Sequence, residues 1–471
     1  MTTRFMVDRG LGVCGAKGFS AAGVACGVKA SGSLDLALVV GAPGTLAAGV
    51  FTTNQVVAAP VVWSRARLAA SADARVVVLN SGNANACTGP AGDAVVRATV
   101  RRAAAELGCR PEQVLVCSTG VIGVPLPADA LSDGIAKAAV SLDPGPAGAS
   151  AAAEAIRTTD TVAKQAGTRV GPVTVGGMAK GAAMLAPALA LPSSPGTATT
   201  AAPPPGASPA PGSGGGPASP AEGLSGPAHA TMLAVLTTDA VATPATLRAA
   251  LAAATTMTFN RITVDGAQST NDTVLLLASG ASGVAPEPDE LTAAVAAVCY
   301  DLAGQMLADA EGGTKVVAVH VGGAGSEAAA LAVARRIADS PLVKAAVYGG
   351  DPNWGRILQA AGTAGVPFDP ARVRLQVRGG AGAAGLEPGP EAGPAPGRPG
   401  VAAPEPGRAP GQPALVELLR DGAPTGADAG AAMAAREIEF RLDLGGAGPW
   451  ACVRTADLTP EYVRLNAEYT T

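Results

Sequence analysis

The stretch GPAHATMLAVLTTDA, residues 226–240, places a threonine where a Pro-, Ala-, Ser- and Gly-rich tract gives way to an apolar run. The hydroxyl of Thr231 is a weak nucleophile unless a base takes its proton. Cutting the chain between Ala230 and Thr231 would supply that base, because a free α-amino group has an ordinary pKa of about 8. Many threonines begin strands only for their β propensity, so these residues alone leave both interpretations open.

The sequence contains few residues that could carry out other catalytic chemistry or bind a metal ion. The only histidines are His229 and His320, and His320 lies in an apolar run where we expect a core or strand-edge position. Two histidines offer little to a metal cluster or a Ser-His-Asp triad, and no G-x-S-x-G or Walker A motif occurs. The seven cysteines are odd in number and contain no C-x-x-C, which predicts reduced thiols rather than disulfides or a zinc site.

One glycine pattern could bind a nucleotide. Gly323-x-Gly325-x-x-Ala328 lies between a predicted strand and a predicted helix, with Asp351 further along, and it imitates a dinucleotide fingerprint. Glycine occurs 62 times in this chain, so chance matches are expected. An ordinary loop leading into a helix is the favoured interpretation, and a non-enzymatic nucleotide-binding protein stays as an alternative.

The composition indicates a globular chain. Its 471 residues suit two or three domains or one large one, and 48% hydrophobic residues can fill a sizeable core. A net charge of −4 and only 3% aromatic residues argue against a nucleic-acid partner. No run of about 18 or more apolar residues is free of charged residues and proline. The start also lacks the apolar segment of a signal peptide, so we expect no membrane partner and a cytoplasmic location.

Strand and helix patterns alternate on both sides of Thr231. These predicted elements must position the Thr231 side chain and the residues that act with it. The sequence predicts strands at 75–80, at 114–118 just before Thr119 and Gly120, from residue 231, and at 273–279, 314–321 and 437–444. The last alternates, which predicts one buried and one wet face. Helices are predicted at 92–107, from N-cap Thr243 with Pro244 in the first turn, and at 288–310.

Two low-complexity tracts interrupt this pattern, at about 188–227 and about 379–413. Both lack large apolar residues, so they are predicted to be disordered. Strands flank each tract and could pair within one sheet system. We therefore interpret the tracts as loop insertions, whose closure cost grows only slowly with length.

The segments around Thr231 resemble the cleavage region of the ornithine acetyltransferase family, also called bifunctional glutamate N-acetyltransferases. The resemblance rests on MAKGAAMLAP and HATMLAVLTTDA, and it extends along almost the whole chain outside the two tracts. Further matching blocks are KGFSAAGVACGVK, NSGNANACTG, CSTGVIGVPLP, IRTTDTVAK, STNDTV, ADAEGGTK, GGDPNWGRI and RLNAEYTT.

The resemblance implies a self-processing enzyme. Members cut themselves at the bond that is Ala230–Thr231 here, and the new amino-terminal threonine takes an acetyl group from N-acetylornithine and passes it to glutamate in a ping-pong cycle. No cofactor is implied, although acetyl-CoA serves some members as a second donor. A self-processing aminopeptidase on the same fold is the alternative, and transfer to glutamate rather than to water separates the two.

The fold implied is α+β, a layered α/β/β/α-like sandwich of the self-processing N-terminal-nucleophile type shared with DmpA-like aminopeptidases. An alpha fragment of residues 1–230 and a beta fragment of residues 231–471 would fold as one catalytic body. Two such bodies would pair as a heterotetramer.

The resemblance also implies the site residues. The Thr119 hydroxyl and the Gly120 backbone N–H would hold the oxyanion. A zwitterionic amino-acid substrate needs both charge signs, so Lys180 would engage a carboxylate and Glu311 an ammonium group. Lys180 would also lower the pKa of a nearby amine. The other substrate-binding residues implied, besides Thr231 itself, are Thr158 or Thr159, Asn466 and Thr471.

Overall fold

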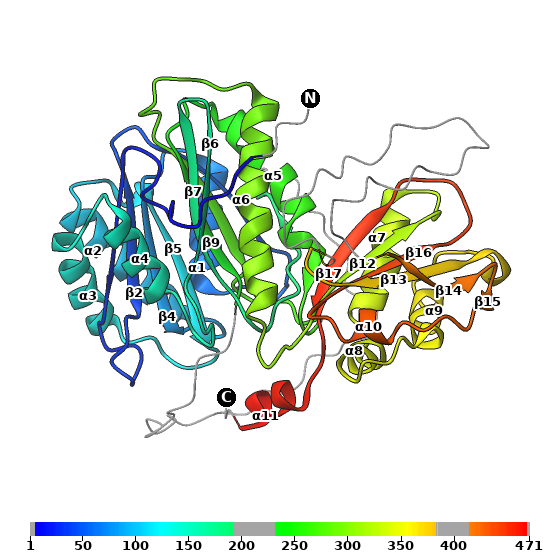
Figure 1. The fold of residues 1–471 in the computed structure, drawn as a ribbon. Helices are drawn as coiled ribbons and strands as arrows, with labels where there is room; N and C mark the ends of the chain where they lie inside the picture. Colours follow the sequence, from blue (N-terminus) through cyan, green and yellow to red (C-terminus); the bar gives the residue numbers. More distant parts are fainter. Residues whose placement is uncertain (1–4, 193–230, 383, 385–413, 469–471) are drawn as a thin grey trace, which may run out of the picture.

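The computed structural model describes residues 5–192, 231–382, 384 and 414–468 (Figure 1). Three sheets organise these residues. The first sheet contains, in spatial order, β1 (Phe19–Val24), β2 (Leu36–Gly41), β4 (Val76–Asn83) and β5 (Val114–Val121). The second contains β6 (Lys164–Val170), β7 (Val173–Lys180), β9 (Leu233–Thr238), β11 (Thr273–Ala278), β3 (Leu46–Thr52) and β8 (Leu189–Ala190).

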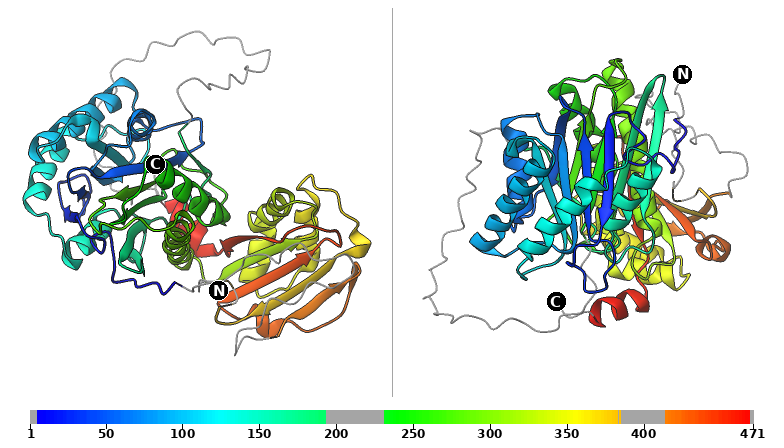
Figure 2. Two further views of the ribbon diagram at one scale, coloured as in Figure 1. Left: turned by 90° about the horizontal axis from the view of Figure 1, so that it is seen from above. Right: turned by 90° about the vertical axis from the view of Figure 1, so that its left-hand side faces the viewer.

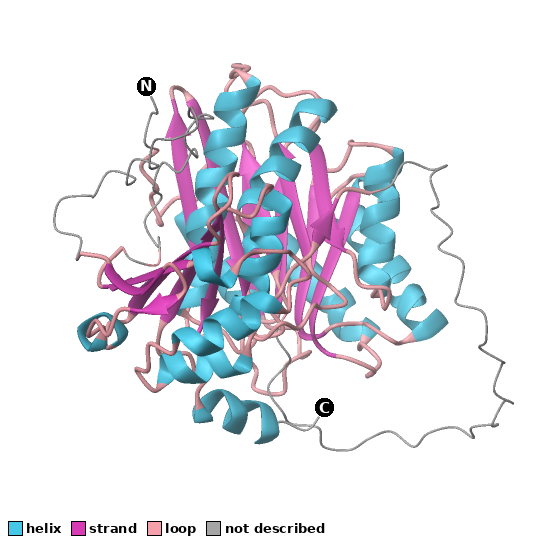
Figure 3. Ribbon diagram, turned by 90° about the vertical axis from the view of Figure 1, so that its right-hand side faces the viewer, coloured by secondary structure: helices cyan, strands magenta, loops and turns pink. Residues whose placement is uncertain are grey.

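These two sheets face each other and share one apolar core. Val39 and Leu79 of the four-stranded sheet belong to the same buried cluster as Val235 and Leu275 of the six-stranded sheet. Helices α2 (Gly89–Glu106) and α3 (Ala128–Val140) pack on the outer face of the four-stranded sheet. Helices α5 (Pro244–Met257) and α6 (Pro288–Ala308) pack on the outer face of the six-stranded sheet. The predicted α/β/β/α sandwich is therefore confirmed. Figure 1 shows its layers side by side, and Figure 3 shows helices lying in front of the strands.

The remaining helices of this body are α1 (Ala59–Ala70) and α4 (Pro146–Ala155), and short 3-10 turns lie at Pro111–Gln113 and Phe259–Arg261. Helix α6 is long and apolar enough, by length and composition, to cross a membrane. It packs against α5, β6 and β7, and 61% of its apolar window is buried. In this fold it is a core helix of the sandwich.

The third sheet forms a separate lobe that the sequence analysis did not predict (Figure 2, left). It contains β10 (Ile262–Thr263), β17 (Ala451–Ala456), β12 (Val316–Gly322), β16 (Glu437–Asp443), β13 (Arg374–Gly379), β14 (Val416–Arg420) and β15 (Ala423–Pro424). Helices α7 (Glu327–Ala338), α8 (Pro341–Tyr348), α9 (Trp354–Gly362) and α10 (Gly430–Met433) accompany it, with a 3-10 turn at Pro370–Arg372. Its main apolar cluster is distinct from those of the sandwich, although Val316, Ala318 and Ala456 pack into the sandwich cluster. We call β10 together with the described residues of 316–456 the C-terminal lobe.

Two predicted strand boundaries near the site are wrong. Thr119 and Gly120 lie within β5 rather than after it, because the parallel partner β4 continues to Asn83 through a register shift at Gly82. The strand predicted from residue 231 begins at Leu233. The predicted helix start is confirmed, since the Thr243 side chain accepts a hydrogen bond from the backbone N–H of Thr246.

The predicted tract boundaries also need correction. Leu189–Ala190 form β8 and pair with β3, and the Asn260 side chain bonds both backbone groups of Leu189, so the first tract does not begin at 188. Gly379 is the last residue of β13, so the second does not begin at 379. Each tract joins segments of a single sheet, as expected, but the two tracts belong to different sheets. Their remaining residues lie outside those described.

The strand at Glu437–Asp443 alternates less cleanly than predicted. Glu439 lies on the face expected to be wet, yet it is only 2% exposed. Arg378 on neighbouring β13 donates from Nε to its carboxylate at 2.5 Å, and Arg441 and His320 lie within 4 Å of it. Cross-strand charge pairing therefore allows this acidic side chain to be buried.

Candidate active site

Thr231 is buried at the entrance to β9, and its hydroxyl has one close neighbour. Thr231 Oγ1 lies 2.9 Å from Ser269 Oγ, and the backbone N–H of Met232 donates to Asp272 Oδ1 at 3.0 Å. Both partners precede β11, which runs parallel to β9 with Thr273 opposite Leu233. Because parallel strands begin at the same edge, residues 269–272 are held against Thr231.

Asp272 is a fully buried carboxyl group with one oxygen left over. Burial raises the pKa of Asp272 to about 7, although the N–H of Met232 opposes that rise. Its Oδ2 has no hydrogen-bond partner among the described residues. Such an atom is costly to bury and is a candidate partner for a ligand or a reacting group.

Asn271 joins the surroundings of Thr231 to the strand that carries Thr119. Its backbone N–H donates to Ser269 Oγ at 3.0 Å, and its Nδ2 donates to the carbonyls of Ala84 and Ser118 at 2.7 and 2.9 Å. Sequence reasoning missed residues 269–272 as site residues. The signal that could have found them is the position of STND just before a strand that pairs with β9.

Lys180 and Thr119 meet between the facing sheets. Lys180 is the last residue of β7, pairs with Leu233 across β7 and β9, and donates from Nζ to Thr119 Oγ1 at 3.2 Å. Both residues are fully buried. Burial lowers the pKa of Lys180 to about 8, while the carboxylates of Asp160 and Glu311 act in the opposite direction.

Gly120 must be glycine for steric reasons. Its φ is +136°, and a Cβ there would lie 2.2 Å from the backbone nitrogen of Asn83 and from the backbone carbon of Gly82. The residue after Thr119 can therefore present only backbone groups.

A buried carboxylate, Asp160, organises the other side of Lys180. Its Oδ1 accepts from Lys164 Nζ and from the N–H of Gly181, each at 2.7 Å. Its Oδ2 accepts from the N–H of Thr158 at 3.1 Å and lies 3.9 Å from Lys180 Nζ. Burial alone would raise the pKa of Asp160, but the ammonium groups of Lys180 and Lys164 hold it well below its usual range.

The two threonines of the RTTD motif have unpartnered hydroxyls at this place. Thr158 Oγ1 and Thr159 Oγ1 are buried and have no hydrogen-bond partner among the described residues. Buried hydroxyls are normally bonded. The described residues therefore leave both Thr158 and Thr159 as candidates for the predicted substrate contact.

Glu311 follows α6 and reaches the same region. Its backbone N–H donates to the carbonyl of Ala182 at 2.9 Å, two residues beyond Lys180, and its Oε2 accepts from Asn466 Nδ2 at 3.1 Å. Asn466 lies on the exposed helix α11 (Pro460–Glu468). The structure therefore brings together Glu311 and Asn466, while Ala230 and Thr471 lie outside the described residues.

The Gly323–Ala328 pattern does lie between a strand and a helix, as predicted, but its loop is occupied by the chain itself. The N–H of Gly325 donates to the carbonyl of Ala447 at 2.8 Å, and a Cβ at Gly323 would lie 2.6 Å from Asp443 Oδ1. Ser326 caps α7. This packing favours the ordinary loop over a phosphate cradle.

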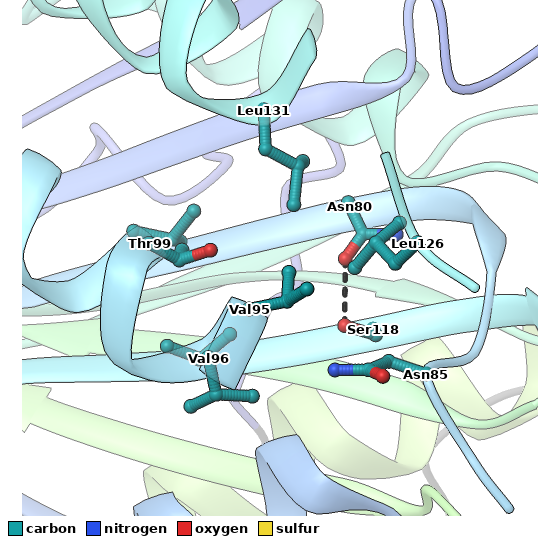
Figure 4. A pocket seen from close by; sticks show the side chains of 10 residues that line it. Asn80, Asn85, Val95, Val96, Thr99, Ser118, Leu126 and Leu131 are labelled. Carbon is teal, nitrogen blue, oxygen red and sulfur yellow. Dashed lines mark hydrogen bonds between the residues drawn. The ribbon is translucent and has the colours of Figure 1, made fainter. Parts of the chain in front are cut away.

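A narrow space lies behind the site, between β4, β5 and the helices α2 and α3 (Figure 4). Ser118 Oγ donates there to Asn80 Oδ1 at 2.6 Å, and the other lining side chains are mostly apolar. Alternation along β5 directs Ser118 to this space and Thr119 to the facing sheet. The space therefore supports the strand that carries Thr119.

Two facing sheets between helical layers, with a buried threonine at the entrance to a central strand, make this the N-terminal-nucleophile type of fold. A model of the ArgJ family matches residues 20–194 and 221–471. The chain belongs to the ArgJ family, the ornithine acetyltransferases, and is an acetyltransferase of arginine biosynthesis.

Individual relatives agree with that membership. The arginine biosynthesis bifunctional protein ArgJ of Mycobacterium tuberculosis is 42% identical over 475 residues, 99% of this chain and 98% of the relative. That of Thermobifida fusca is 41% identical over 455 residues, 96% and 98% of the two chains. The crystal structure of ornithine acetyltransferase from M. tuberculosis, complexed with ornithine, is 51% identical and covers 40% of this chain and 100% of that chain, with a TM-score of 0.39.

Proposed function

We propose that the chain cuts itself between Ala230 and Thr231 and then moves an acetyl group from N-acetylornithine to glutamate. The observation that carries the proposal is the position of the buried Thr231 Oγ1, 2.9 Å from Ser269 Oγ and beside the parallel entrance of β11. Register places Lys180, with Thr119 bonded to it, two residues from this nucleophile on the adjacent strand.

The cut is an acyl shift followed by hydrolysis. Thr231 Oγ attacks the carbonyl carbon of residue 230, and its proton leaves along the hydrogen bond to Ser269 and returns to the departing nitrogen of Thr231. The C–N bond breaks and an ester to Oγ forms. Water then splits the ester, which frees the carboxyl group of residue 230, the hydroxyl of Thr231 and its α-amine.

The transfer uses the same hydroxyl, now with its own amine as base. Oγ attacks the acetyl carbonyl of N-acetylornithine, the amine takes the hydroxyl proton and gives it to the departing nitrogen, and ornithine leaves. The amino group of glutamate then attacks the acetyl ester, and N-acetylglutamate leaves as Oγ recovers a proton. The Thr119 hydroxyl and the Gly120 N–H stabilise the negative oxygen in both halves.

The charges around the site suit amino-acid substrates. Lys180 offers a cation to a carboxylate, and Glu311, held by Asn466, offers an anion to an ammonium group. The unpartnered hydroxyls of Thr158 and Thr159 supply further hydrogen bonds to the substrate. In this proposal Thr471 completes the set from the end of the chain.

The working unit of this proposal contains an alpha fragment of residues 1–230 and a beta fragment of residues 231–471, paired as a heterotetramer in the cytoplasm. All seven cysteines are free thiols, the state that a reducing compartment maintains. Acetyl-CoA is a second donor from which Thr231 would accept the same acetyl group.

Intact-mass analysis tests the proposal. Wild-type protein should appear as two chains meeting at Ala230/Thr231 and should gain one acetyl group when given N-acetylornithine without glutamate. Thr231→Ala should stay uncut and inactive, while Thr231→Ser, which keeps the hydroxyl, should cut and transfer more slowly. A single uncut wild-type chain of 45.5 kDa with full transferase activity would overturn the proposal. Transfer of the acyl group to water in place of glutamate would favour the aminopeptidase.

A further inference from the structure

We propose that Asp160, Lys180 and Thr119 act as one unit, in which the Lys180 ammonium donates to Thr119 Oγ1 and so directs the Thr119 proton to the developing oxyanion. Asp160 touches no reacting atom in this proposal and is a positioning residue. The inference rests on the proposed function, because an oxyanion forms at Thr119 only if acyl transfer occurs there.

The geometry at Thr119 fixes the direction of its proton. A threonine hydroxyl has one proton to donate and lone pairs to accept with. Lys180 Nζ has only protons to offer, so in the 3.2 Å contact Thr119 Oγ1 must be the acceptor while Lys180 is charged. The Thr119 proton is then free for another acceptor. A hydroxyl that accepts from a cation is also a stronger donor, since hydrogen bonds in a chain polarise one another.

Asp160 supplies the charge that keeps this ammonium group in a buried place. A fully buried lysine favours its neutral form unless an anion is near. Asp160 Oδ2 lies 3.9 Å from Lys180 Nζ, and two backbone N–H groups and Lys164 hold the carboxylate in place. Neutral Lys180 could accept from Thr119 instead, and the Thr119 proton would then turn away from the oxyanion.

Several other charges act on Lys180. Lys164 and Lys29 oppose its protonation, and Glu311 supports it. The charge of Lys180 in turn lowers the pKa of Asp272, which lies on the side of β9 and β11. Asp309 binds Lys164 at 2.5 Å, and among the described residues the ion pair of Lys180 is with Asp160, not with Asp309. Asp309 is therefore a matched control: the same residue type in the same buried network, one step removed from Lys180.

The pH dependence of kcat tests the inference. Wild-type activity should fall as pH rises through the Lys180 pKa of about 8, because deprotonation removes the donor to Thr119. Asp160→Asn should move this basic limb to lower pH by about one unit or more, since an anion within 4 Å favours the charged form. Asp309→Asn should leave the limb where it is. A limb that stays in place in Asp160→Asn, or moves equally in both variants, would overturn the inference.

A double-mutant cycle gives a second measurement that does not depend on the pH limb. Thr119→Val should reduce kcat by about 100-fold, as expected for one oxyanion donor. Asp160→Asn alone should reduce kcat by about 10-fold at pH 8, but by less than about 3-fold in the Thr119→Val background, because its effect passes through Thr119. Fully additive losses would overturn the inference.

Acetylation of the wild-type protein distinguishes failure of the proposed function from failure of this inference. If wild-type protein never gains an acetyl group, the proposed function is wrong. If it does, and Asp160→Asn is also cut and acetylated, the pH limb and the cycle decide the inference alone. Asp160→Glu, which restores the carboxylate, should move the basic limb back toward its wild-type position, whereas a merely structural role for Asp160 would change stability and leave the limb unmoved.

Discussion

Two buried lysines, Lys180 in the sandwich and Lys344 in the C-terminal lobe, have very different sets of bonding partners. Burial lowers the pKa of each to about 8. Lys344 of α8 donates to Thr455 Oγ1 and to the carbonyl of Ala456, each at 2.5 Å. Lys180 has one hydroxyl at 3.2 Å and one carboxylate at 3.9 Å. Lys344 therefore has close hydrogen-bond partners, as does Lys164 of the sandwich, which Asp160 and Asp309 bind at 2.7 and 2.5 Å. Lys180 alone of the three keeps donor capacity for another acceptor.

The unpartnered polar atoms follow the same division. Around the candidate site, Thr158 Oγ1, Thr159 Oγ1 and Asp272 Oδ2 are buried without a hydrogen-bond partner among the described residues. Within the described part of the C-terminal lobe no buried side-chain nitrogen or oxygen lacks one. Since unsatisfied buried groups are costly, a saturated network indicates a structural role and an unsaturated one indicates a place where a ligand completes the bonding. Three more such atoms lie elsewhere in the sandwich, on Arg67, Arg102 and Gln165.

Replacing each lysine by methionine gives the sharpest contrast. Lys180→Met should reduce kcat by about 10²–10³-fold, because it removes the donor behind Thr119 and a cation for the substrate. Lys344→Met should leave the kinetics of the folded enzyme within about 3-fold and lower the free energy of unfolding by about 1–3 kcal/mol. Steady-state kinetics and urea unfolding of both variants check this. A loss of activity in folded Lys344→Met comparable to that in Lys180→Met would break the comparison.

Asp272 should give the protein a stability that falls with rising pH. Its folded pKa of about 7 lies above the ordinary value of 3.8, so the folded state binds the proton more tightly than the unfolded state. The contribution is fully present below about pH 4 and is lost as pH rises to about 7, at about 1.4 kcal/mol per unit in the steepest part. Asp272→Asn should flatten this slope in urea unfolding between pH 5 and 8. An unchanged slope would show that Asp272 is ionised throughout.

The sequence predicted the main residues of this site, but not the residues that hold them in position. The strands, the core helices and the sandwich followed from apolar patterns and the resemblance, and so did Thr231, Thr119, Lys180 and Glu311. Asp160 and Lys164 look like an ordinary i,i+4 pair in sequence. Only the fold shows that Lys164 also binds Asp309, which lies 145 residues away.

The same limit explains the other differences. Residues 269–272 matter because β11 runs parallel to β9, and no local pattern specifies which strands pair. The C-terminal lobe went unpredicted because no linker sets it off. Its short strand β10 follows α5 closely in the chain and pairs with β17 almost two hundred residues later.

The two unpartnered hydroxyls of the RTTD motif extend the comparison to neutral groups. Thr158→Val and Thr159→Val should each raise KM by about 5–10-fold and leave stability nearly unchanged, since neither hydroxyl bonds to a described residue. Thr455→Val in the lobe, where the hydroxyl accepts from Lys344, should lower the free energy of unfolding by about 1 kcal/mol without changing KM. Steady-state kinetics and urea unfolding of the three variants check this. Threonine variants of the two regions that lose stability equally would contradict the division.

The smallest effect is expected at the exposed helix α11. Asn466→Ala removes the 3.1 Å bond to Glu311 Oε2, and a single bond from an exposed amide side chain contributes little, so KM should rise by only about 2–4-fold. Arg464→Ala, on the same helix and paired with Glu461 and Glu468, is the matched control and should leave KM unchanged. Equal effects of the two variants would mean that α11 acts as a whole rather than through Asn466.

The order of strands in the six-stranded sheet bears on how this protein can be made and taken apart. β9 and β11, from beyond residue 230, lie side by side between β7 and β3, from before it. The two fragments of a chain broken at residue 230 should therefore stay associated on dilution. Their separation would break the hydrogen bonds between β7 and β9 and between β11 and β3, and would expose a shared core. For the same reason neither half has a finished sheet to fold on alone. Expressed from separate genes, the halves should be recovered only when they are produced together.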